Sequence, residues 1–246
     1  MFAIVIPTYQ RKNGLTPNYI QNISQMLAQQ TYQNFRVFLI GDNYENNLEF
    51  QRLTNLFPRD KIFAYNNNKS YRQGYFQHAA NKWCIGGVMA IKIGVEQAYK
   101  EGFKYYLHLD DDDSWTANKL EKVAEIVTQF PEAEFLFHAS VYFDKILPEE
   151  HSIKTYFPLS YNNLLPRSSN IVHSSNILSL KCYDIFMNYT LSIMEIAEKI
   201  KEGKIAEYNL SPFDAELINV ILNAKLKCIY IPEILSIKRS DVNIPN

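Results

Sequence analysis

The feature that most constrains the fold is an alternation of strand-like and helix-like segments over the first 110 residues. Short apolar runs typical of buried strands occupy residues 2–6, 35–40, 61–65 and 105–109. Residues 87–101 carry apolar positions at helical spacing and are followed by Gly102, a residue that favours a helix C-terminus. Strands that alternate with helices form parallel sheets. We therefore predict an open α/β sheet with ligand-binding loops at the carboxyl ends of its strands.

The second half of the chain is more mixed. Helical patterns cover 120–130, 184–202 and 211–224, and strand patterns cover 134–143, 171–180 and 225–231. A further helix is predicted to begin at Thr16-Pro17, with Thr16 as its N-cap. The stretch 65–83 has no strong periodicity and is interpreted as a loop between a strand and a helix, and a position over the donor site is left open. Because no repeat or low-complexity linker interrupts the chain, we predict a single domain over 1–246, made of the halves 1–113 and 114–246.

Composition excludes several classes of protein. Hydrophobic residues make up 47% of the 246 residues and the formal net charge is −1, which argues against disorder. Nucleic acid is not expected as a ligand, because its binding depends on a basic excess. The three cysteines, Cys84, Cys182 and Cys228, lack metal-site or disulfide spacing, so a reducing compartment is expected.

The N-terminal segment bears on localisation. Residues 1–7 are apolar but lack a charged leader region and end at a proline, so they are interpreted as a strand and not a signal peptide. No apolar run approaches the ~20 residues of a membrane-spanning helix. The cytoplasm is therefore expected, and peripheral contact with the inner face of a membrane is left open.

Four consecutive aspartates follow the strand at 105–109. Because side chains alternate along extended backbone, Asp110 and Asp112 are expected to face the same way. Two such carboxylates repel each other unless a cation lies between them, and their oxygens suit Mg²⁺ or Mn²⁺. The pattern predicts a divalent cation that bridges the protein and a diphosphate. A solvated acidic turn is the simpler alternative. A phosphatase-type D-x-D-x-[TS] loop, which residues 110–114 also satisfy, normally ends the first strand of its fold and not the fourth.

In these features the chain resembles glycosyltransferase family 2, a branch of the GT-A fold. Residues 4–11, I-V-I-P-T-Y-Q-R, look like that family's first strand and nucleotide loop, and residues 40–42, I-G-D, look like its base-contacting aspartate. Residues 109–115, L-D-D-D-D-S-W, look like its D-x-D element. Residues 211–217, S-P-F-D-A-E-L, are similar to the E-D-x-x-L segment that carries its catalytic base. The order and spacing of these segments also fit. The resemblance implies a GT-A (Rossmann-like) fold with an open mixed, mainly parallel sheet flanked by helices.

Carried over to this sequence, the resemblance implies a set of site residues. The nucleotide or donor contacts are Pro7, Thr8, Tyr9, Arg11, Asp42, Asp110 and Asp111. The metal ligands are Asp112 and Asp110, holding Mn²⁺ or Mg²⁺, and the catalytic base is Asp214. From the residues alone, Asp214 at position N3 of a helix is also explained by capping and the helix dipole. Asp42 in a Gly-Asp-Asn sequence is likewise explained as a turn residue.

The chain departs from the family pattern at two places. The family's A-R-N-x-G reads A-I-K-I-G at 90–94, where Lys92 is expected to supply a point charge to the donor. The glutamate that precedes the base is replaced by Phe213. Lys238 and Arg239 near the C-terminus are weaker candidates for contact with the diphosphate, and His173 is a further weak candidate.

The function predicted from the sequence is a metal-dependent, inverting glycosyltransferase. It would move a sugar from a nucleotide-diphosphate donor, with UDP-sugars favoured by the resemblance, to a hydroxyl of a glycan or glycoconjugate. Retention of configuration stays open. One alternative is a sugar nucleotidyltransferase, but residues 7–11 lack the glycines of the G-x-G-x-R loop that such an enzyme carries. The other is a catalytically degenerate glycan-binding module.

Overall fold

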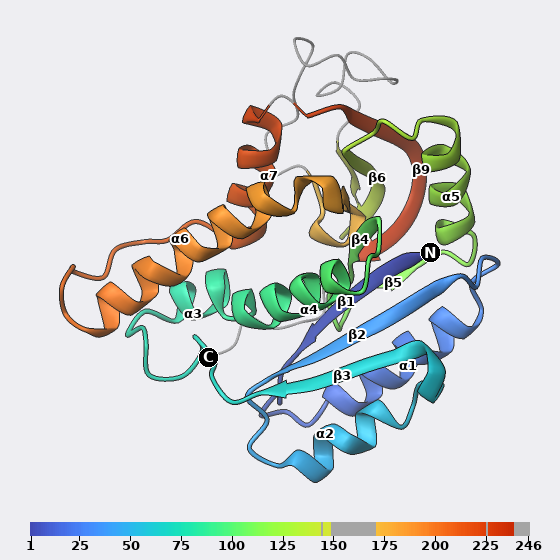
Figure 1. The fold of residues 1–246 in the computed structure, drawn as a ribbon. Coiled ribbons are helices and arrows are strands. Elements are labelled where there is room, and N and C mark those ends of the chain that lie inside the picture. The colour runs from blue at the N-terminus through green and yellow to red at the C-terminus, as the bar shows by residue number, and fades with distance from the viewer. Residues whose placement is uncertain (144, 149–170, 225, 239–246) are drawn as a thin grey trace.

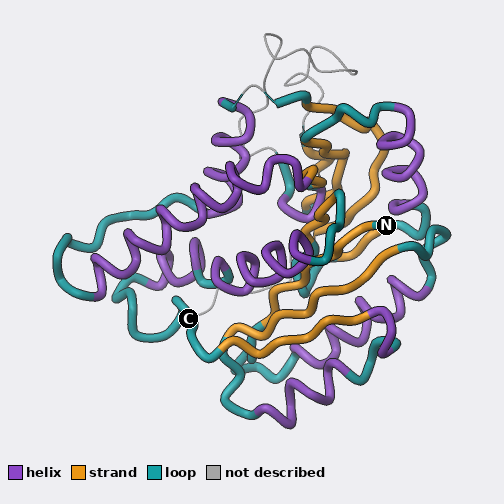
Figure 2. The backbone as a smooth tube through the Cα atoms, viewed as in Figure 1, coloured by secondary structure: helices purple, strands orange, loops and turns teal. Residues whose placement is uncertain are grey.

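The computed structural model describes residues 1–143, 145–148, 171–224 and 226–238. The strands are β1 (Phe2–Thr8), β2 (Phe35–Asp42), β3 (Ile62–Asn67), β4 (Tyr105–His108), β5 (Ser114–Trp115), β6 (Phe135–Tyr142), β7 (Lys145–Leu147), β8 (Ile177–Ser179) and β9 (Cys228–Lys238). The α-helices are α1 (Thr16–Ala28), α2 (Asn47–Thr54), α3 (Ala79–Ile85), α4 (Val88–Lys100), α5 (Lys119–Gln129), α6 (Tyr183–Lys201) and α7 (Phe213–Asn223). Figure 1 shows these elements along the chain, and Figure 2 shows the strands between layers of helices.

All strands belong to one sheet, in the order β3-β2-β1-β4-β8-β6-β9-β5, with β7 paired to β6. The first half is parallel, because β1 pairs in parallel with both β2 and β4, and β2 pairs in parallel with β3. The second half is mixed: β8 is antiparallel to β4 and β6, whereas β9 is parallel to β6. The predicted mixed, mainly parallel α/β sheet flanked by helices is confirmed. Its parallel half brings the carboxyl ends of β1, β2 and β4 to the same edge.

Two predicted strands have different extents in the structure. The strand expected at 171–180 is reduced to β8, because residues 173–175 form a 3₁₀ turn (η5) and residues 180–182 form another (η6). The strand expected at 225–231 instead continues as β9 to Lys238, and its pairing with β6 shifts register between His138 and Ser140. The longer β9 matters for function because its last residue reaches the aspartate cluster.

The two faces of the sheet bury separate apolar clusters. Successive β1 side chains point to opposite faces, so Ile4 and Ile6 join one cluster whereas Ala3 and Val5 join the other. The first cluster includes residues of α1, α2 and α5, and the second includes residues of α4, α6 and α7. Each fully buried large apolar side chain contributes roughly 1.5–3 kcal/mol. Burial on both faces holds β1 rigidly, and β1 leads directly into the predicted nucleotide loop.

Gly94 sets how closely α4 packs against β1. A Cβ at this position would lie 2.4 Å from Cγ1 of Val5, so a larger residue would force the helix off the sheet. At the other end of the interface, a Cβ on Gly87, which precedes α4, would lie 3.9 Å from Cβ of Pro7. The first turn of α4 therefore lies beside the carboxyl end of β1.

Helix termini differ in detail from the sequence-based expectations. Leu15, not Thr16, occupies the N-cap of α1, and the hydroxyl of Thr16 instead donates to the Tyr9 carbonyl at 2.9 Å and accepts from the Arg11 amide at 3.1 Å. Helix α7 begins after Pro212, so Asp214 is at N2 rather than N3. Gly102 has φ 77°, which confirms the left-handed residue predicted after α4.

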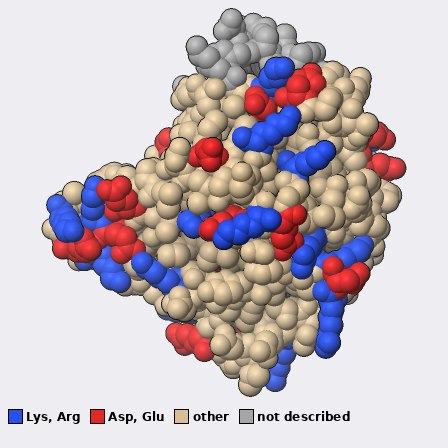
Figure 3. Space-filling model, in the orientation of Figure 1, with Lys and Arg blue, Asp and Glu red and all other residues tan. Residues whose placement is uncertain are grey.

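The surface and helices bear on the wider environment of the protein. In Figure 3, Lys and Arg side chains lie interspersed with Asp and Glu side chains over the face shown. Within the described ranges, no helix combines the length and apolarity that crossing a membrane requires.

Candidate active site

The predicted site residues lie along the carboxyl edge of β1, β2 and β4. Thr8 is opposite Gly41 in the parallel pairing, so the loops after β1 and β2 leave the sheet side by side. On the other side of β1, the Leu109 amide donates to the Val5 carbonyl at 3.1 Å just before the aspartates begin. This arrangement gathers the loop after β1, Asp42 and the four aspartates into one corner.

The four aspartates form a tight turn, here called the acidic turn (residues 110–113). The Asp113 amide donates to the Asp110 carbonyl at 3.1 Å, with Asp111 and Asp112 at the corner. The predicted extended alternation is therefore wrong at this point, because the backbone reverses direction directly after β4. The turn sends Asp111 and Asp112 toward the loop after β1, whereas Asp110 and Asp113 face the residues around Ser174.

Arg11 holds one side of the acidic turn. Its guanidinium donates to both Asp111 oxygens, at 2.8 and 2.5 Å, and to Asp112 at 3.3 Å. The Thr8 hydroxyl adds a third bond to Asp111 at 2.8 Å. Burial alone would lower the pKa of Arg11, but the hydrogen bonds and charge of Asp111 outweigh it and raise the pKa. Asp111 is thus a structural anchor that fixes the loop after β1 to the turn.

A polar row supports Asp110 from behind. Alternation along β4 places Tyr106 and His108 on one face, and the Tyr106 hydroxyl is 2.9 Å from Nδ1 of His108. Beyond the end of β4, Oδ1 of Asp110 lies 2.8 Å from Nε2 of His108. Lys238 lies 3.2 Å from the other Asp110 oxygen, and the Asp110 amide donates to the Ser174 hydroxyl. Burial opposes ionisation, but Lys238 and His108 hold the pKa of Asp110 well below its usual range.

The acidic turn carries excess negative charge. In the described part of the chain, Arg11 and Lys238 are the cations that pair with its four aspartates. Burial, followed by the charges of Asp111 and Asp110, raises the pKa of Asp112 to about 6. Burial is also the main cause that raises the pKa of Asp113 to about 7. A further positive charge would stabilise the ionised turn.

Asp42 forms a second polar corner at the end of β2. Its Oδ2 accepts from the Ser70 hydroxyl at 2.8 Å and from Nε of Arg72 at 3.1 Å. Its Oδ1 is buried and has no hydrogen-bond partner among the described residues. Burial raises the pKa of Asp42 to about 6, against the opposing effects of Arg72 and Ser70. A buried acceptor that the chain leaves unsatisfied is a position where a ligand N–H would fit.

Tyr9 lies between the two corners. The Arg11 guanidinium carbon is 4.3 Å from the centre of the Tyr9 ring, and that of Arg72 is 4.0 Å away. Two cationic groups and an aromatic face thus lie together beside Asp42. Arg72 packs against Gly86, where a Cβ would lie 2.4 Å from the Lys82 carbonyl oxygen and 2.6 Å from Cγ of the arginine. A larger residue at this position would therefore clash with the backbone of α3 and with Arg72.

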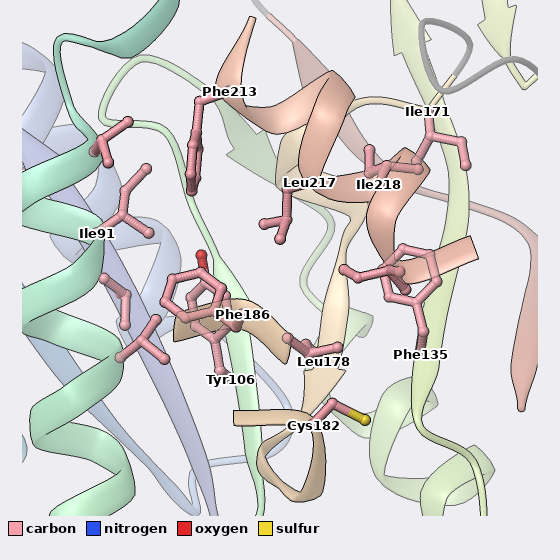
Figure 4. Close-up of a cluster of buried hydrophobic side chains, with 14 of the residues drawn as sticks. Ile91, Tyr106, Phe135, Ile171, Leu178, Cys182, Phe186, Phe213, Leu217 and Ile218 are labelled. Atoms are coloured by element: carbon pink, nitrogen blue, oxygen red, sulfur yellow. The ribbon is translucent and has the colours of Figure 1, made fainter. Parts of the chain in front are cut away.

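Asp214 approaches the acidic turn from the other half of the chain. It lies in the first turn of α7, where burial and then the charge of Asp110 raise its pKa, while Lys238 opposes the rise. The preceding Phe213 is buried, and its ring lies 5.3 Å from that of Tyr189. Figure 4 shows Phe213 pointing into the apolar cluster that includes Tyr106 and Phe186. The buried phenylalanine fixes the helix turn that presents Asp214.

Comparison with known proteins identifies the chain. The sequence pattern of glycosyl transferase family 2 matches residues 3–186. An uncharacterized glycosyltransferase of Acanthamoeba polyphaga mimivirus is 37% identical over 244 residues, which cover 95% of this chain and 91% of the relative. The chain belongs to glycosyltransferase family 2.

Solved structures share the fold of this family 2 glycosyltransferase at low sequence identity. S. aureus TarS 1–349 in complex with UDP-GlcNAc has a TM-score of 0.64 at 15% identity, covering 99% of this chain and 60% of that one. The mannosyltransferase PcManGT from Pyrobaculum calidifontis, in complex with GDP-Man and Mn²⁺, has a TM-score of 0.54 at 10% identity, covering 98% and 58%. The longer TarS chain is covered over 37% of its length. The likeness confirms the GT-A type of fold.

The two departures of this glycosyltransferase from the family pattern lie in the same apolar cluster. Ile91 on α4 and Phe213 on α7 are buried in the same apolar cluster, and Figure 4 shows both side chains within it. The family's arginine and glutamate are thus both replaced by apolar residues that pack in one core. Lys92, expected at the donor, instead forms an ion pair with Glu96 at 2.8 Å along α4. No contact of Lys92 within the described residues joins it to the acidic turn.

Several site residues gave no clear signal in the sequence. Ser70 and Arg72 lie in the stretch 65–83, for which the sequence left open a loop over the donor site but indicated no individual residue. Ser174 lies where a strand is expected from the sequence. Lys238 was a weak candidate and contacts Asp110, whereas Arg239 lies outside the described residues. Their partners are far away in the sequence, so no local pattern could reveal them.

The donor atoms at the acidic turn fit a divalent cation. Asp110 and Asp112 are its more accessible carboxylates, with side chains 26% and 16% exposed, and hard oxygen donors suit Mg²⁺ and Mn²⁺. His108, Asp110 and His173 also have ligand atoms within 4.8 Å of one another. However, the His108 and His173 rings are stacked, with their centres 3.5 Å apart and their planes at 15°. A cation bound to a ring nitrogen lies near the plane of that ring, so a cation bound to one of these imidazoles would lie outside the plane of the other. The carboxylates are the better candidates.

Proposed function

We propose that this glycosyltransferase moves a sugar from a UDP-sugar to a hydroxyl of a glycan or glycoconjugate, with a divalent cation and with inversion at the anomeric carbon. The observation that carries the proposal is the convergence of Asp42, the acidic turn and Asp214 at one edge of the sheet. The halves 1–113 and 114–246 would bind donor and acceptor, respectively, with Lys238 reaching back from the second half to the turn.

The nucleobase is assigned to the corner formed by Tyr9, Asp42 and Arg72. The unsatisfied Oδ1 of Asp42 would accept an N–H from the base, while Ser70 and Arg72 keep its other oxygen in place. Pro7 and Thr8 lead the chain from β1 into this corner. Uracil offers an N–H donor on its pairing edge. The UDP-GlcNAc complex of TarS, which has the same fold, supports a uridine nucleotide.

The diphosphate is assigned to the acidic turn. Asp112 and Asp110 would hold Mn²⁺ or Mg²⁺, in line with the excess negative charge of the turn and with Mn²⁺ in the PcManGT complex. Such a cation neutralises charge that develops on the leaving diphosphate, an effect worth several kcal/mol. Arg11 and Lys238 flank the same position and add fixed positive charge.

Asp214 is assigned as the general base. As the acceptor oxygen bonds to the anomeric carbon, the bond from that carbon to the diphosphate oxygen breaks, and the acceptor proton passes to the Asp214 carboxylate. The raised pKa of Asp214 makes it a better proton acceptor than an ordinary aspartate. Positioned base catalysis contributes roughly 10²–10⁴-fold.

The test is turnover by the purified protein. UDP-GlcNAc and GDP-Man would be compared as donors, with Mn²⁺ or with EDTA, using wild-type protein and Asp214→Asn. We expect nucleotide release from the UDP-sugar that requires the cation and falls at least ~100-fold in Asp214→Asn. Full turnover in EDTA would overturn the metal assignment, and wild-type turnover by Asp214→Asn would overturn the base. Glycan binding without nucleotide release would favour the degenerate glycan-binding alternative.

A further inference from the structure

One segment, residues 69–84, contacts both ends of the candidate site. Near its start, Ser70 and Arg72 hold Asp42. Near its end, Asn81 and Cys84 of α3 contact the residues that lead into α7. The corner around Asp42, to which the nucleobase is assigned, and the first turn of α7, which carries Asp214, are therefore both held by residues 69–84.

Asn81 is the central contact between α3 and the segment before α7. The residue is 1% exposed, and among the described residues its carboxamide bonds to this segment. Its Nδ2 donates to Oε1 of Glu207 and to the Tyr208 carbonyl, both at 2.8 Å, and its Oδ1 accepts from the Leu210 amide at 2.9 Å. Every hydrogen-bonding group of the buried carboxamide except one lone pair is thus used on residues 207–210.

Further contacts make residues 207–210 a fixed strap and not a loose loop. The Glu207 carboxylate also accepts from the backbone amides of Gln77 and His78, at 2.8 and 3.1 Å. The Cys84 thiol donates to the Leu210 carbonyl at 3.3 Å. Both backbone polar groups of Leu210 are therefore bonded to α3.

The fixed strap ends close to Asp214. Ser211 and Pro212 separate Leu210 from α7, and the proline ring restricts the backbone at the N-cap. On the far side, the Phe213 carbonyl accepts from the Tyr189 hydroxyl at 3.4 Å. The strap thus holds the chain before α7, and Tyr189 holds its first residue, Phe213, directly before Asp214.

We propose that Asn81 is a positioning residue for Asp214, acting through the strap 207–210, an inference that rests on the base role proposed above. Asn81 is buried and bonds to residues 207–210, so its proposed role is indirect. It fixes the approach of the chain into α7, and with it the place from which the Asp214 carboxylate meets the acceptor hydroxyl. A displacement of about 1 Å at a reacting group can cost ~10²-fold in rate.

The experiment exchanges the hydrogen-bond donor and acceptor in the contact between Asn81 and Glu207. Asn81→Asp places a second carboxylate against Glu207 and removes both donors, so the strap should separate from α3. Adding Glu207→Gln can turn an amide donor toward the new carboxylate at the position of Oε1, while the amide oxygen, at the position of Oε2, still accepts from the Gln77 amide. The bond from the His78 amide to Oε1 is then lost. We expect kcat to fall about 100-fold in Asn81→Asp and to recover by about tenfold in the double variant. The recovery is partial because the new amide restores the contact between residues 81 and 207, whereas the Tyr208 carbonyl and the His78 amide do not regain their partners. Donor KM and the Kd for UDP should change less than about twofold, because the Asp42 corner is untouched.

Gln30→Ala is the matched control. Gln30 is also buried, and its carboxamide likewise bridges two backbone groups, the Thr116 carbonyl and the Leu120 amide, but it lies between α1 and α5. It should lower the melting temperature as Asn81→Asp does, yet leave kcat near wild type. Hydrogen exchange provides a second readout: amides of 208–216 should lose protection in Asn81→Asp and regain it in the double variant.

Each result decides the inference. Unchanged exchange over 208–216, wild-type kcat in folded Asn81→Asp, or no rescue by Glu207→Gln would overturn it. If Asn81→Asp does not fold, the single Glu207→Gln variant, changed at the less buried partner, should still show reduced kcat and faster exchange. A wild-type kcat in Asp214→Asn would instead refute the proposed base. Inactive Asp214→Asn together with unaffected Asn81→Asp would refute the positioning role alone.

Discussion

Lys238 at the end of β9 places its ammonium 3.2 Å from Oδ2 of Asp110, which follows β4, although 128 positions separate them. The same ammonium is 3.8 Å from Asp113. Burial would lower the pKa of Lys238, but the charges of Asp110 and Asp113 raise it. The second half of the chain thus supplies a fixed cation to the acidic turn of the first.

Lys238→Met should destabilise the protein and make it depend more on a divalent cation. We expect a loss of roughly 2 kcal/mol, below the figure for a fully buried pair because both side chains are partly exposed. Mn²⁺ should then raise the melting temperature more in the variant than in wild type, since it replaces the lost charge. Lys122→Met, which removes a surface pair with Glu125, is the control. An equal Mn²⁺ effect in variant and wild type would contradict a shared site.

Replacing Asp111 or Asp112 by asparagine should have opposite effects on stability. Asp111→Asn leaves the Arg11 charge buried without its main partner, so we expect a loss of about 3–5 kcal/mol. Asp112→Asn removes a carboxylate whose ionisation its neighbours oppose, so stability should hold or rise. Mn²⁺ binding and turnover should be lost in Asp112→Asn. Denaturant unfolding and Mn²⁺ titration calorimetry measure the two effects, and wild-type Mn²⁺ affinity in Asp112→Asn would exclude that residue as a ligand.

Donor binding should release a proton near pH 6 because of Asp42. The pKa of this carboxyl is raised by burial to about 6, so it is partly protonated at that pH. A base N–H at Oδ1 favours the ionised form and lowers the pKa, so binding expels a proton. The release should be largest between the lowered pKa of the complex and the pKa of about 6 of the free protein. It should vanish well above pH 6, where the carboxyl is ionised with and without ligand.

The measurement is calorimetry of UDP-GlcNAc binding in buffers of different ionisation enthalpy. The sugar nucleotide is suitable because its diphosphate does not titrate near pH 6. Asp42→Asn should lose the proton release, and the difference between wild type and this variant isolates Asp42 from Asp112 and Asp113. Equal proton release in both proteins would show that the nucleobase does not bind at Asp42.

One buried charged side chain in the apolar cluster that contains Ile91 and Phe213 should destabilise the protein. Phe213→Glu buries an unpaired carboxylate in the cluster of Figure 4, so we expect a loss of at least about 3 kcal/mol. Ile91→Arg together with Phe213→Glu restores the family's residue types at both positions and should recover part of the stability. Urea unfolding of the single and double variants gives the coupling energy. Strictly additive losses would show that the two positions act independently.

The sequence alone determined the parallel half of the fold and the edge where the site forms. Apolar runs of strand length that alternate with helical spacing leave few arrangements other than a parallel sheet, and parallel strands must end at a common edge. The loop after β1, Asp42 and the four aspartates each directly follow such a strand. Their gathering could therefore be predicted without knowing a single contact.

Tertiary structure alone decided how these residues are held and charged. Because residues 110–113 form a turn, some of the aspartates contact Arg11 and the others contact Ser174 and Lys238. The alternation of an extended strand does not predict this arrangement. Arg72 reached Asp42 from a stretch with no periodicity, while Lys92 paired along its own helix. The physical reason is that pairing energies and pKa shifts depend on burial and on neighbours distant in the chain. Hydrophobic periodicity records only which face of an element is buried, not which charge it meets there.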